Sequence, residues 1–516
     1  MSISISYGAH FRVLAGLCAG LLATACAAPL PHQILSEPVR RDAERSASFA
    51  GFAGSVDGAH AGGRVEGGLC TWTPAQATRL TLTVAIEKAL CSHPKIRDAR
   101  AAVNVERHQR FVALGSLLPS ASATISNAQT YNNSRSLFGR SVTETKGSSS
   151  SMSFNWLLYD FGGRAAQIEA ATELVIAASA GQDIALQNAF ASVVDAYFQM
   201  LTSESMAEVA RASIANSERA VAAAKVRSEL GAATAADLQF ARVGLAQAEL
   251  VAARINEQLE LSKGDLAASL HLDPGMPIKL ASKAAERELE AQFFNERSSE
   301  KIGALIGAVE NHPQIRAATA RANASSAQLS AAKSEFLPKV SLAGNLYVNG
   351  RPGSSVSDAP SKEKFVGVSV VVPMFDGFST YNRSRAAQAQ HERALAQLED
   401  ARGQVKSSVW KAHQSSIMSV KSLKAADAVV FNADVAKTQA RLRYQNGAGD
   451  IADWLRAEKT YFDARIDVIK AKAEIRSARL RLVLALGDLG SWTFEQWPQN
   501  ENMELLVRQR SVKSQL

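Results

Sequence analysis

The side chains that most often carry chemistry form no catalytic or metal-binding pattern in this sequence. The nine histidines are scattered, and His, Cys, Asp and Glu do not cluster at metal-ligand spacings. A phosphate-binding loop of the form G-x-x-x-x-G-K-[ST] and a G-x-S-x-G nucleophile turn are both absent from the sequence. His93 and His312 each precede a proline that can start a helix, which predicts a structural role. We therefore expect no enzyme activity, no bound metal and no cofactor.

Cysteines are the other reactive groups, and one of them lies at a predicted processing site. Arg12 precedes an apolar run over residues 13–25, which is too short for a membrane span and is followed by small residues. This pattern predicts a signal peptide over residues 1–25 and export from the cytoplasm. Cleavage before Cys26 would expose that cysteine for lipid attachment, whereas cleavage after Ala27 would be ordinary processing. The sequence leaves both open.

Of the four cysteines, Cys18 lies within the signal and Cys26 lies at the cleavage site, which leaves Cys70 and Cys91 as a possible pair in the exported chain. An oxidising compartment favours a disulfide between them, and the alternative is two buried free thiols. Closing a loop of this length would stabilise the fold by about 3 kcal/mol. The bond would join the N-terminal arm, residues 26–79, to the first helix.

The composition indicates long helices and argues against a nucleic-acid partner. The 516 residues include only 6% aromatics, and long segments of Ala, Leu, Arg, Glu and Gln are free of proline. The formal charge of +8 is spread along the chain, and no basic block alternates with aromatic residues. Beyond the signal, no run of about 18 apolar residues predicts a membrane helix. The exported chain is therefore expected to be periplasmic, secreted or an outer-membrane β-protein.

An internal duplication covers most of the chain. The segment His93–Arg97, HPKIR, recurs as His312–Arg316, HPQIR, at an offset of 312 − 93 = 219. Residues 159–163, YDFGG, match residues 374–378, MFDGF, with their aspartates 376 − 160 = 216 positions apart. Two structural repeats are predicted from this similarity. They cover residues 80–270 and 301–490, with a linker over 271–300 and a C-terminal tail over 491–516.

Each repeat predicts the same order of elements. A helix opened by proline comes first, followed by two strands and a helix roughly 100 Å long at 1.5 Å per residue. A shorter helix then returns after a glycine turn. The predicted helices cover residues 94–117, 163–229 and 234–270 in the first repeat and 313–336, 379–444 and 450–486 in the second. Helices of this length need partners along them, as in coiled coils.

The strands alternate apolar and polar residues, as strands between lipid and water do. Val366, Val368 and Val370, for example, share one face of a strand. The segments around residues 132–148 and 349–363 are rich in Ser, Gly and Asn and are predicted as exposed loops. Four strands cannot close a barrel around a channel, and open edges are excluded from lipid, so several chains must share one barrel. A soluble coiled-coil protein with surface hairpins is the alternative.

The motifs around these strands resemble the TolC family of outer-membrane factors. The resemblance covers roughly residues 82–490 and rests on the duplication, Leu-Pro before each strand pair, WLLYDFGGR over 156–164 and VPMFDG over 372–377. It implies an α+β membrane protein, a homotrimer that shares a twelve-stranded outer-membrane β-barrel continued by a long α-helical coiled-coil tunnel in the periplasm. The sequence CTW at 70–72, followed by ALCSHP at 89–94, is similar to the branch that serves type I secretion.

The same resemblance implies a function and its partners. The chain would be the passive outer-membrane channel of a type I secretion system, in contact with outer-membrane lipid. Its partners would be a periplasmic adaptor (membrane fusion) protein, an inner-membrane ABC transporter that supplies energy, and an exported protein such as an RTX-type toxin. The small-residue turns at 231–233 and 446–449 would let the adaptor approach closely. The alternatives are the channel of a multidrug or small-molecule efflux pump and a soluble trimeric scaffold.

In this family, polar links near the helix turns close the periplasmic end of the tunnel. The resemblance places Asp237 and Tyr444 at the two partners of one link, and Asp453 in an acidic ring that lines the constriction. Asp450 lies one helical turn before Asp453, on the same face. It could extend the ring or simply cap the helix that begins there. Three copies of these aspartates would make a negative throat that favours cations.

Two positions depart from the family pattern. The arginine of the usual second link falls at Gly449, and the next acidic ring position falls at Arg456. The second link is therefore absent or rebuilt, and Arg443 is the candidate to rebuild it.

Overall fold

The computed structural model describes residues 80–136, 139–281, 302–349 and 361–487 of the chain. All of them belong to one compact unit, Leu69–Leu489. The predicted signal peptide with Cys26, the N-terminal arm with Cys70, most of the linker and the C-terminal tail lie outside the described residues.

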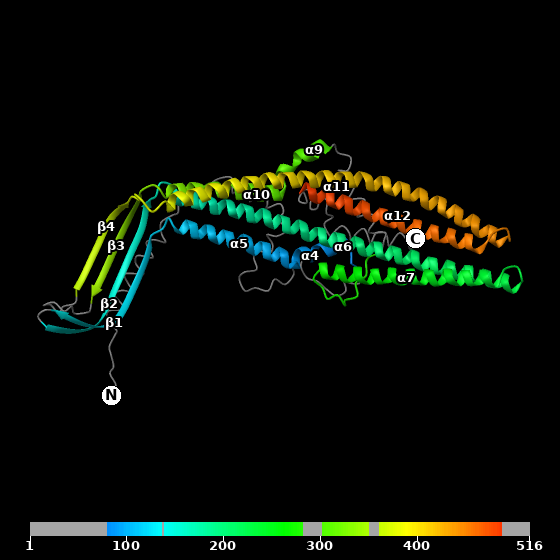
Figure 1. Cartoon of the computed structure of the whole chain (residues 1–516), viewed down its shortest axis with the longest axis horizontal. Helices are drawn as coiled ribbons and strands as arrows, with labels where there is room; N and C mark the ends of the chain where they lie inside the picture. Colours follow the sequence, from blue (N-terminus) through cyan, green and yellow to red (C-terminus); the bar gives the residue numbers. More distant parts are fainter. Residues whose placement is uncertain (1–79, 137–138, 282–301, 350–360, 488–516) are drawn as a thin grey trace, which may run out of the picture. The chain divides into compact units, whose positions relative to one another are not determined.

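The duplication predicted from the sequence is present in the fold. Each repeat has a 22-residue helix before its strands, α5 or α10, and a 67-residue helix after them, α6 or α11. The return helices α7 and α12 have 35 and 36 residues. The helix bounds are α4 Leu82–Ser92, α5 Pro94–Gly115, α6 Gly163–Glu229, α7 Ala235–Ser269, α9 Ile302–Gly307, α10 Pro313–Ser334, α11 Ser379–Gln445 and α12 Ile451–Leu486, with a 3-10 turn η4 at Ala308–Asn311 (Figure 1).

The histidine-proline pairs start helices, as predicted. The Nδ1 atom of His93 accepts the backbone N–H of Lys95 at 3.2 Å, and proline occupies the first turn of α5. His312 caps α10 in the same way, through the N–H of Gln314 at 3.2 Å. A neutral imidazole nitrogen thus takes one of the N–H groups that a helix start leaves free.

The long helices pack through small side chains. Helix α6 contacts α7, α10 and α5, and α11 contacts α12 and α10. Alanines recur on the buried side of α6, for example Ala166, Ala170, Ala177 and Ala180. Short side chains at such spacings let neighbouring helices approach closely along their length.

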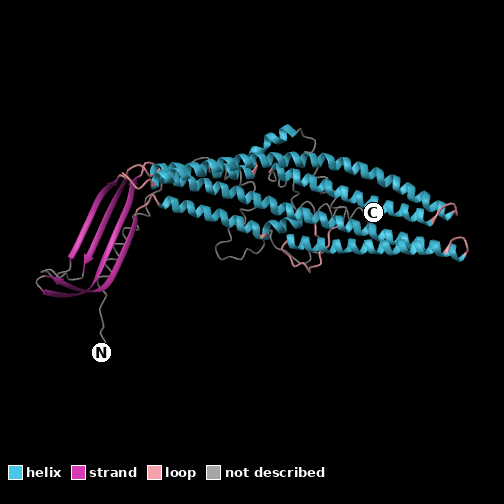
Figure 2. Cartoon of the chain, in the orientation of Figure 1, coloured by secondary structure: helices cyan, strands magenta, loops and turns pink. Residues whose placement is uncertain are grey.

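The strands form one antiparallel sheet in the order β1-β2-β3-β4 (Figure 2). Their bounds are β1 Ser120–Ser136, β2 Gly139–Tyr159, β3 Lys339–Asn349 and β4 Ser361–Val371. The prediction of a loop around residues 132–148 was wrong, because β1 and β2 stay paired as far as Ser136 and Gly139. Continuous ladder hydrogen bonds there outweigh the low strand propensity of Ser, Gly and Asn.

The pairing register gathers the apolar residues of different strands on one face of the sheet. Trp156 of β2 lies opposite Leu342 of β3, which lies opposite Val368 of β4. On the other face, Ser341 and Ser369 share a hydrogen bond of 2.8 Å between their hydroxyl groups. The sheet of one chain therefore has an apolar and a polar face, and its outer strands β1 and β4 each pair on one side only within the described residues.

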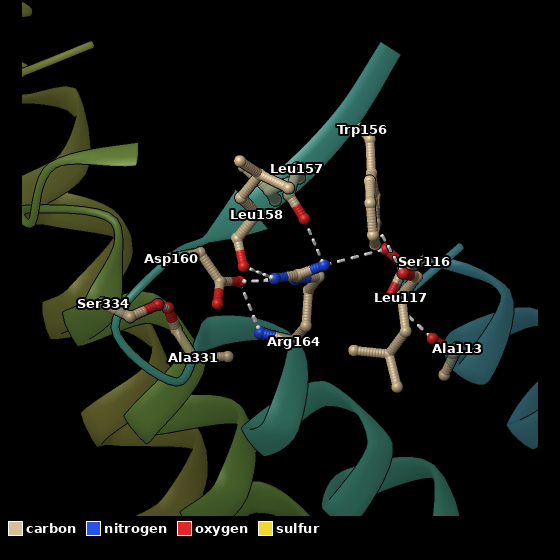
Figure 3. A network of polar contacts seen from close by, with 10 residues as sticks. All are labelled: Ala113, Ser116, Leu117, Trp156, Leu157, Leu158, Asp160, Arg164, Ala331 and Ser334. Atoms are coloured by element: carbon tan, nitrogen blue, oxygen red, sulfur yellow. Dashed lines mark hydrogen bonds and ion pairs between the residues drawn. The ribbon is translucent and has the colours of Figure 1, made fainter. Parts of the chain in front are cut away.

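Arg164 joins the end of β2 to the starts and ends of neighbouring helices (Figure 3). Its guanidinium donates to the carbonyl oxygens of Leu157 at 2.7 Å and Leu158 at 3.1 Å, and to that of Ser116 at the end of α5 at 3.3 Å. The Asp160 carboxylate lies 3.3 Å from its Nε atom and accepts the Arg164 backbone N–H at 2.7 Å. The YDFGGR motif thus stabilises the junction between strand β2 and helix α6.

Candidate functional site

The site predicted from the sequence lies at two helix turns, between α6 and α7 and between α11 and α12 (Figure 1). Gly231 and Gly447 hold these turns in the left-handed region, with φ of +71° and +76°. In each turn the glycine N–H and the N–H that follows it bond back to carbonyl groups of the preceding helix. Glycine adopts this Schellman conformation without a steric penalty, so both helices end at the residue type that the sequence marks.

A small hydrophobic cluster packs beneath the turns. Tyr444 at the end of α11 is 3% exposed and lies against Trp454 of α12, with ring centroids 5.5 Å apart. Ala224 of α6 and Ala241 of α7 belong to the same cluster, as does Ile451. The cluster includes residues of α6, α7, α11 and α12, so a substitution at Tyr444 would disturb the packing of both helical hairpins.

Arg227 is the main polar connection between the two turns. Its Nη1 atom donates to the carbonyl oxygens of Tyr444 at 2.9 Å and Gln445 at 3.1 Å, and its Nη2 atom donates to that of Ala232 at 3.3 Å. Its guanidinium also lies 5.1 Å from the centre of the Tyr444 ring. A cation at the C-terminal end of α11 is favoured by the carbonyl groups that the helix leaves free.

No motif in the sequence marks Arg227. Its local context is an ordinary helical arginine, and the carbonyl groups that it binds lie 444 − 227 = 217 residues away or more in the second repeat. One signal is present in hindsight: Arg227 and Arg443 stand at equivalent places, each four residues before a helix-ending glycine.

Asp237 and Tyr444, the predicted link, are not hydrogen-bonded to each other within the described chain. The Asp237 carboxylate accepts the Thr234 backbone N–H at 2.8 Å, and Thr234 Oγ1 accepts the Asp237 N–H at 3.2 Å. This capping box starts α7. The buried Tyr444 hydroxyl has no partner among the described residues. Burial raises the pKa of the phenol, and the nearby Asp237 and Asp450 charges raise it further against the opposing effect of Arg227.

Asp450 and Asp453 both lie at the start of α12. Asp450 caps that helix by accepting the Ala452 N–H at 3.3 Å, so the capping interpretation of this residue is confirmed. Asp453 is exposed and pairs with Arg456 at 3.1 Å. The arginine that departs from the family pattern therefore neutralises part of the acidic charge beside it.

Gly449 leaves room for Arg443 in the second turn. A Cβ atom at Gly449 would lie 3.0 Å from the Cβ of Arg443 and 3.3 Å from the Tyr444 backbone nitrogen. A larger residue there would press on the end of α11. The Arg443 side chain is exposed.

Cys91 is disulfide-bonded in the structure. Its predicted partner, Cys70, lies outside the described residues, so the pairing stays a prediction. Within the described ranges, no group of His, Cys, Asp and Glu is arranged to hold a metal ion. No helix among these residues combines the length and apolar content of a membrane span.

Comparison with known proteins shows which family this chain belongs to. The chain matches the family model described as outer membrane efflux protein over residues 85–270 and 306–488. It is 28% identical to protein CyaE of Bordetella pertussis over 478 residues, which cover 88% of this chain and 97% of CyaE. It is 24% identical to the alkaline protease secretion protein AprF of Pseudomonas aeruginosa over 309 residues, which cover 59% of this chain and 62% of AprF.

The fold is also similar to a solved structure. The crystal structure of the outer membrane protein VceC from Vibrio cholerae matches with a TM-score of 0.67 and 22% sequence identity, over 79% of this chain and 96% of that one. Paired strands that continue into long helical hairpins, in two repeats, define a channel of the outer membrane and not an enzyme. The chain belongs to the outer membrane efflux protein family, and the predicted resemblance to TolC-type proteins is confirmed.

Proposed function

We propose that three copies of this chain form one outer-membrane duct that exports a protein in a type I secretion system. The observation that carries the proposal is the open four-stranded sheet. Its apolar face includes Val366, which is 79% exposed, and Val368, which is 64% exposed. Lipid would cover that face, and the unpaired sides of β1 and β4 would find partners on neighbouring copies. Three copies supply twelve strands, enough to enclose a water-filled channel.

The partners follow from a duct that has no energy source of its own. An inner-membrane ABC transporter would supply the energy, and a periplasmic adaptor would connect that transporter to the helix turns. The proposal of a protein cargo is supported by the similarity to CyaE over nearly its full length, and by AprF, whose name describes secretion of a protease. The CTW and ALCSHP motifs, which resemble the type I branch, support it as well.

We assign closure of the duct to the turns between α6 and α7 and between α11 and α12. Asp237 and Tyr444 would form their link only in the assembled trimer, where a neighbouring copy can rearrange the tip. Asp453 would line the constriction, with Asp450 fixed beside it as a helix cap. Replacing Tyr444 with Phe and Asp237 with Ala together is then expected to raise single-channel conductance in planar bilayers. A double variant that conducts like the parent protein would show that the link lies elsewhere.

Two measurements test the proposed function. Native mass measurement in detergent is expected to give three chains, and a stable monomer in detergent-free buffer would refute the shared barrel. Deletion of the gene in its host is expected to remove a protein from the culture medium. The second candidate, an efflux channel, is favoured by the description of the matching family and predicts greater sensitivity to small toxic compounds instead. Unchanged secreted protein together with such sensitivity would decide for efflux.

A further inference from the structure

The charged residues of the sheet lie mostly on one face, the face that carries Val366 and Val368, here called the outward face. Side chains alternate along a strand, so the pairing register gives the face of each residue. The basic residues on the outward face of the four described strands are Arg135, Arg140, Lys146, Lys362 and Lys364, and the acidic residue there is Glu144. The outward face therefore carries 5 − 1 = 4 net positive charges, whereas the other face carries only Glu363 and, next to the helices, Lys339.

The basic residues lie beyond the apolar part of the outward face, at the end of the sheet away from the helices. Helices α5, α6, α10 and α11 all join the strands at the opposite end (Figure 1). On β3 the outward residues from Val340 to Val348 are apolar or glycine, and these 348 − 340 = 8 steps cover about 27 Å along the strand. Outer-membrane barrels have an apolar band roughly 25 Å tall. Lys364 and Lys362 follow Val366 on β4, so they lie where acyl chains end and head groups begin.

Strands β1 and β2 continue past the other two strands as a two-stranded hairpin. The last row that includes all four strands contains Ser126 of β1, and β1 runs on to Ser136, 136 − 126 = 10 residues or about 34 Å further along the strand. Arg135 and Arg140 are directly opposite each other near the end of this hairpin, on the outward face. The Nε atom of Arg140 donates to the Asn133 side chain at 2.9 Å. Like charges at opposed positions repel each other, and an anion bound between them would remove that repulsion.

The basic side chains of the outward face are available to a ligand. All five are exposed. The side chains of Arg135, Lys362 and Lys364 form no hydrogen bond or ion pair with the described residues. The acidic residue of this face, Glu144, is already paired with Lys146 at 2.9 Å. The outward face therefore has an excess of positive charge that the described part of the chain does not neutralise.

We propose that the outward face binds a phosphorylated glycolipid of the outer leaflet, and that its basic residues contact the phosphate groups. This inference rests on the proposed barrel and goes beyond apolar contact with lipid tails. Lys362 and Lys364 bind the phosphates next to the acyl chains, because their apolar stems follow the valines while their ammonium groups reach the head groups. Arg135 and Arg140 bind phosphates on the sugar chain, since a guanidinium can hold two phosphate oxygens at once. A lipid is the occupant because the charge lies on the face that continues the apolar band.

Native mass spectrometry of the full chain in detergent, titrated with defined lipids, tests the lysines. Diphosphoryl lipid A is expected to stay bound, and phosphatidylglycerol, which has a phosphate but no phosphorylated sugar, is expected to be retained several-fold less. Lys362→Gln with Lys364→Gln is expected to lower the retention of lipid A several-fold. Lys421→Gln with Lys424→Gln, at two exposed lysines of α11, is the matched control and is expected to bind like the parent protein. Equal retention of lipid A by the two double variants would overturn the inference.

Lipopolysaccharide with a phosphorylated core tests the hairpin in the same measurement. Arg135→Gln with Arg140→Gln is expected to lower its retention several-fold and to leave the retention of lipid A unchanged. Glu144→Gln, which removes the negative charge of the outward face, is expected to raise retention. If neither variant changes the retention of this lipopolysaccharide, the hairpin does not bind its phosphates.

The native mass separates this inference from the proposed duct. Protein with the mass of three chains that retains diphosphoryl lipid A no better than phosphatidylglycerol would overturn the glycolipid site while the duct stands. A stable monomer in detergent-free buffer would overturn both, because the apolar band would then not face lipid.

Discussion

Replacing Arg227 with Met tests the connection between the two helix hairpins of one subunit. Methionine keeps much of the apolar stem of the side chain but removes the charge and all three hydrogen bonds to carbonyl oxygens, at 2.9, 3.1 and 3.3 Å. It also removes the buried Nε atom, which has no hydrogen-bond partner among the described residues. The α11–α12 turn is then held to the α6–α7 turn mainly by the cluster around Tyr444 and Trp454.

The size of the effect follows from the bonds that are lost. Hydrogen bonds to a charged group contribute about 1.5–3 kcal/mol each when buried, but water can replace the two longer and more exposed ones. We therefore expect a net loss of about 2 kcal/mol per subunit. If three subunits open together, the total of about 6 kcal/mol is enough to move a two-state equilibrium from almost fully closed to almost fully open.

Single-channel recording in planar bilayers is the assay for Arg227→Met. We expect a large rise in conductance, with Arg227→Lys in between because it keeps the charge without the planar fork. Arg219→Met is the matched control, since Arg219 lies on the same helix and its side chain donates only to Asn216 among the described residues, at 3.3 Å. Native mass should show that each variant keeps the assembly of the parent protein. An Arg227→Met channel that has both the native mass and the conductance of the parent protein would refute the role of Arg227 in holding the hairpins together.

Three further predictions concern the throat, the pH response and the disulfide. Asp453→Ala should weaken cation preference in bilayers and Arg456→Ala should strengthen it, because the two charges pair at 3.1 Å; unchanged selectivity in both would place them outside the throat. Burial lowers the pKa of His312, so the unfolded state binds its proton more readily and stability falls as pH drops below about 6.5. His312→Asn, which keeps a capping oxygen but does not titrate, should flatten that part of the stability profile measured by thermal unfolding, and an equally steep profile would contradict this. Non-reducing peptide mapping should find Cys70 joined to Cys91, and alkylation of both thiols in exported protein would contradict the pairing.

Much of the local structure could be predicted because its causes are local. A proline after His93 or His312 fixes where a helix begins, and Gly231 and Gly447 fix where the long helices end. Alternating apolar residues such as Val366 and Val368 predict a two-faced strand without any knowledge of its neighbours. The repeat itself is visible as matched motifs at constant offsets.

The strand pairing and the polar contacts at the tip needed the tertiary structure. The serine- and asparagine-rich segment around residues 132–148 is strand because a neighbouring strand supplies its hydrogen bonds, which its own composition does not reveal. The resemblance predicts Asp237 as a gate residue, but only the tertiary structure shows that within the chain its carboxylate accepts the Thr234 backbone N–H. Both outcomes depend on which partner lies within hydrogen-bond distance.

Arg227 shows the division between sequence and tertiary structure most clearly. By sequence alone this protein is a duplicated chain of long helices and two-faced strands, because helix caps, glycine turns and apolar periodicity act over a few residues. Only the tertiary structure brings Arg227 to the carbonyl groups of Tyr444 and Gln445 and leaves Arg443 exposed. The physical reason is that a guanidinium binds whichever carbonyl oxygens the packing of distant helices places within about 3 Å, and no spacing along the chain encodes that distance.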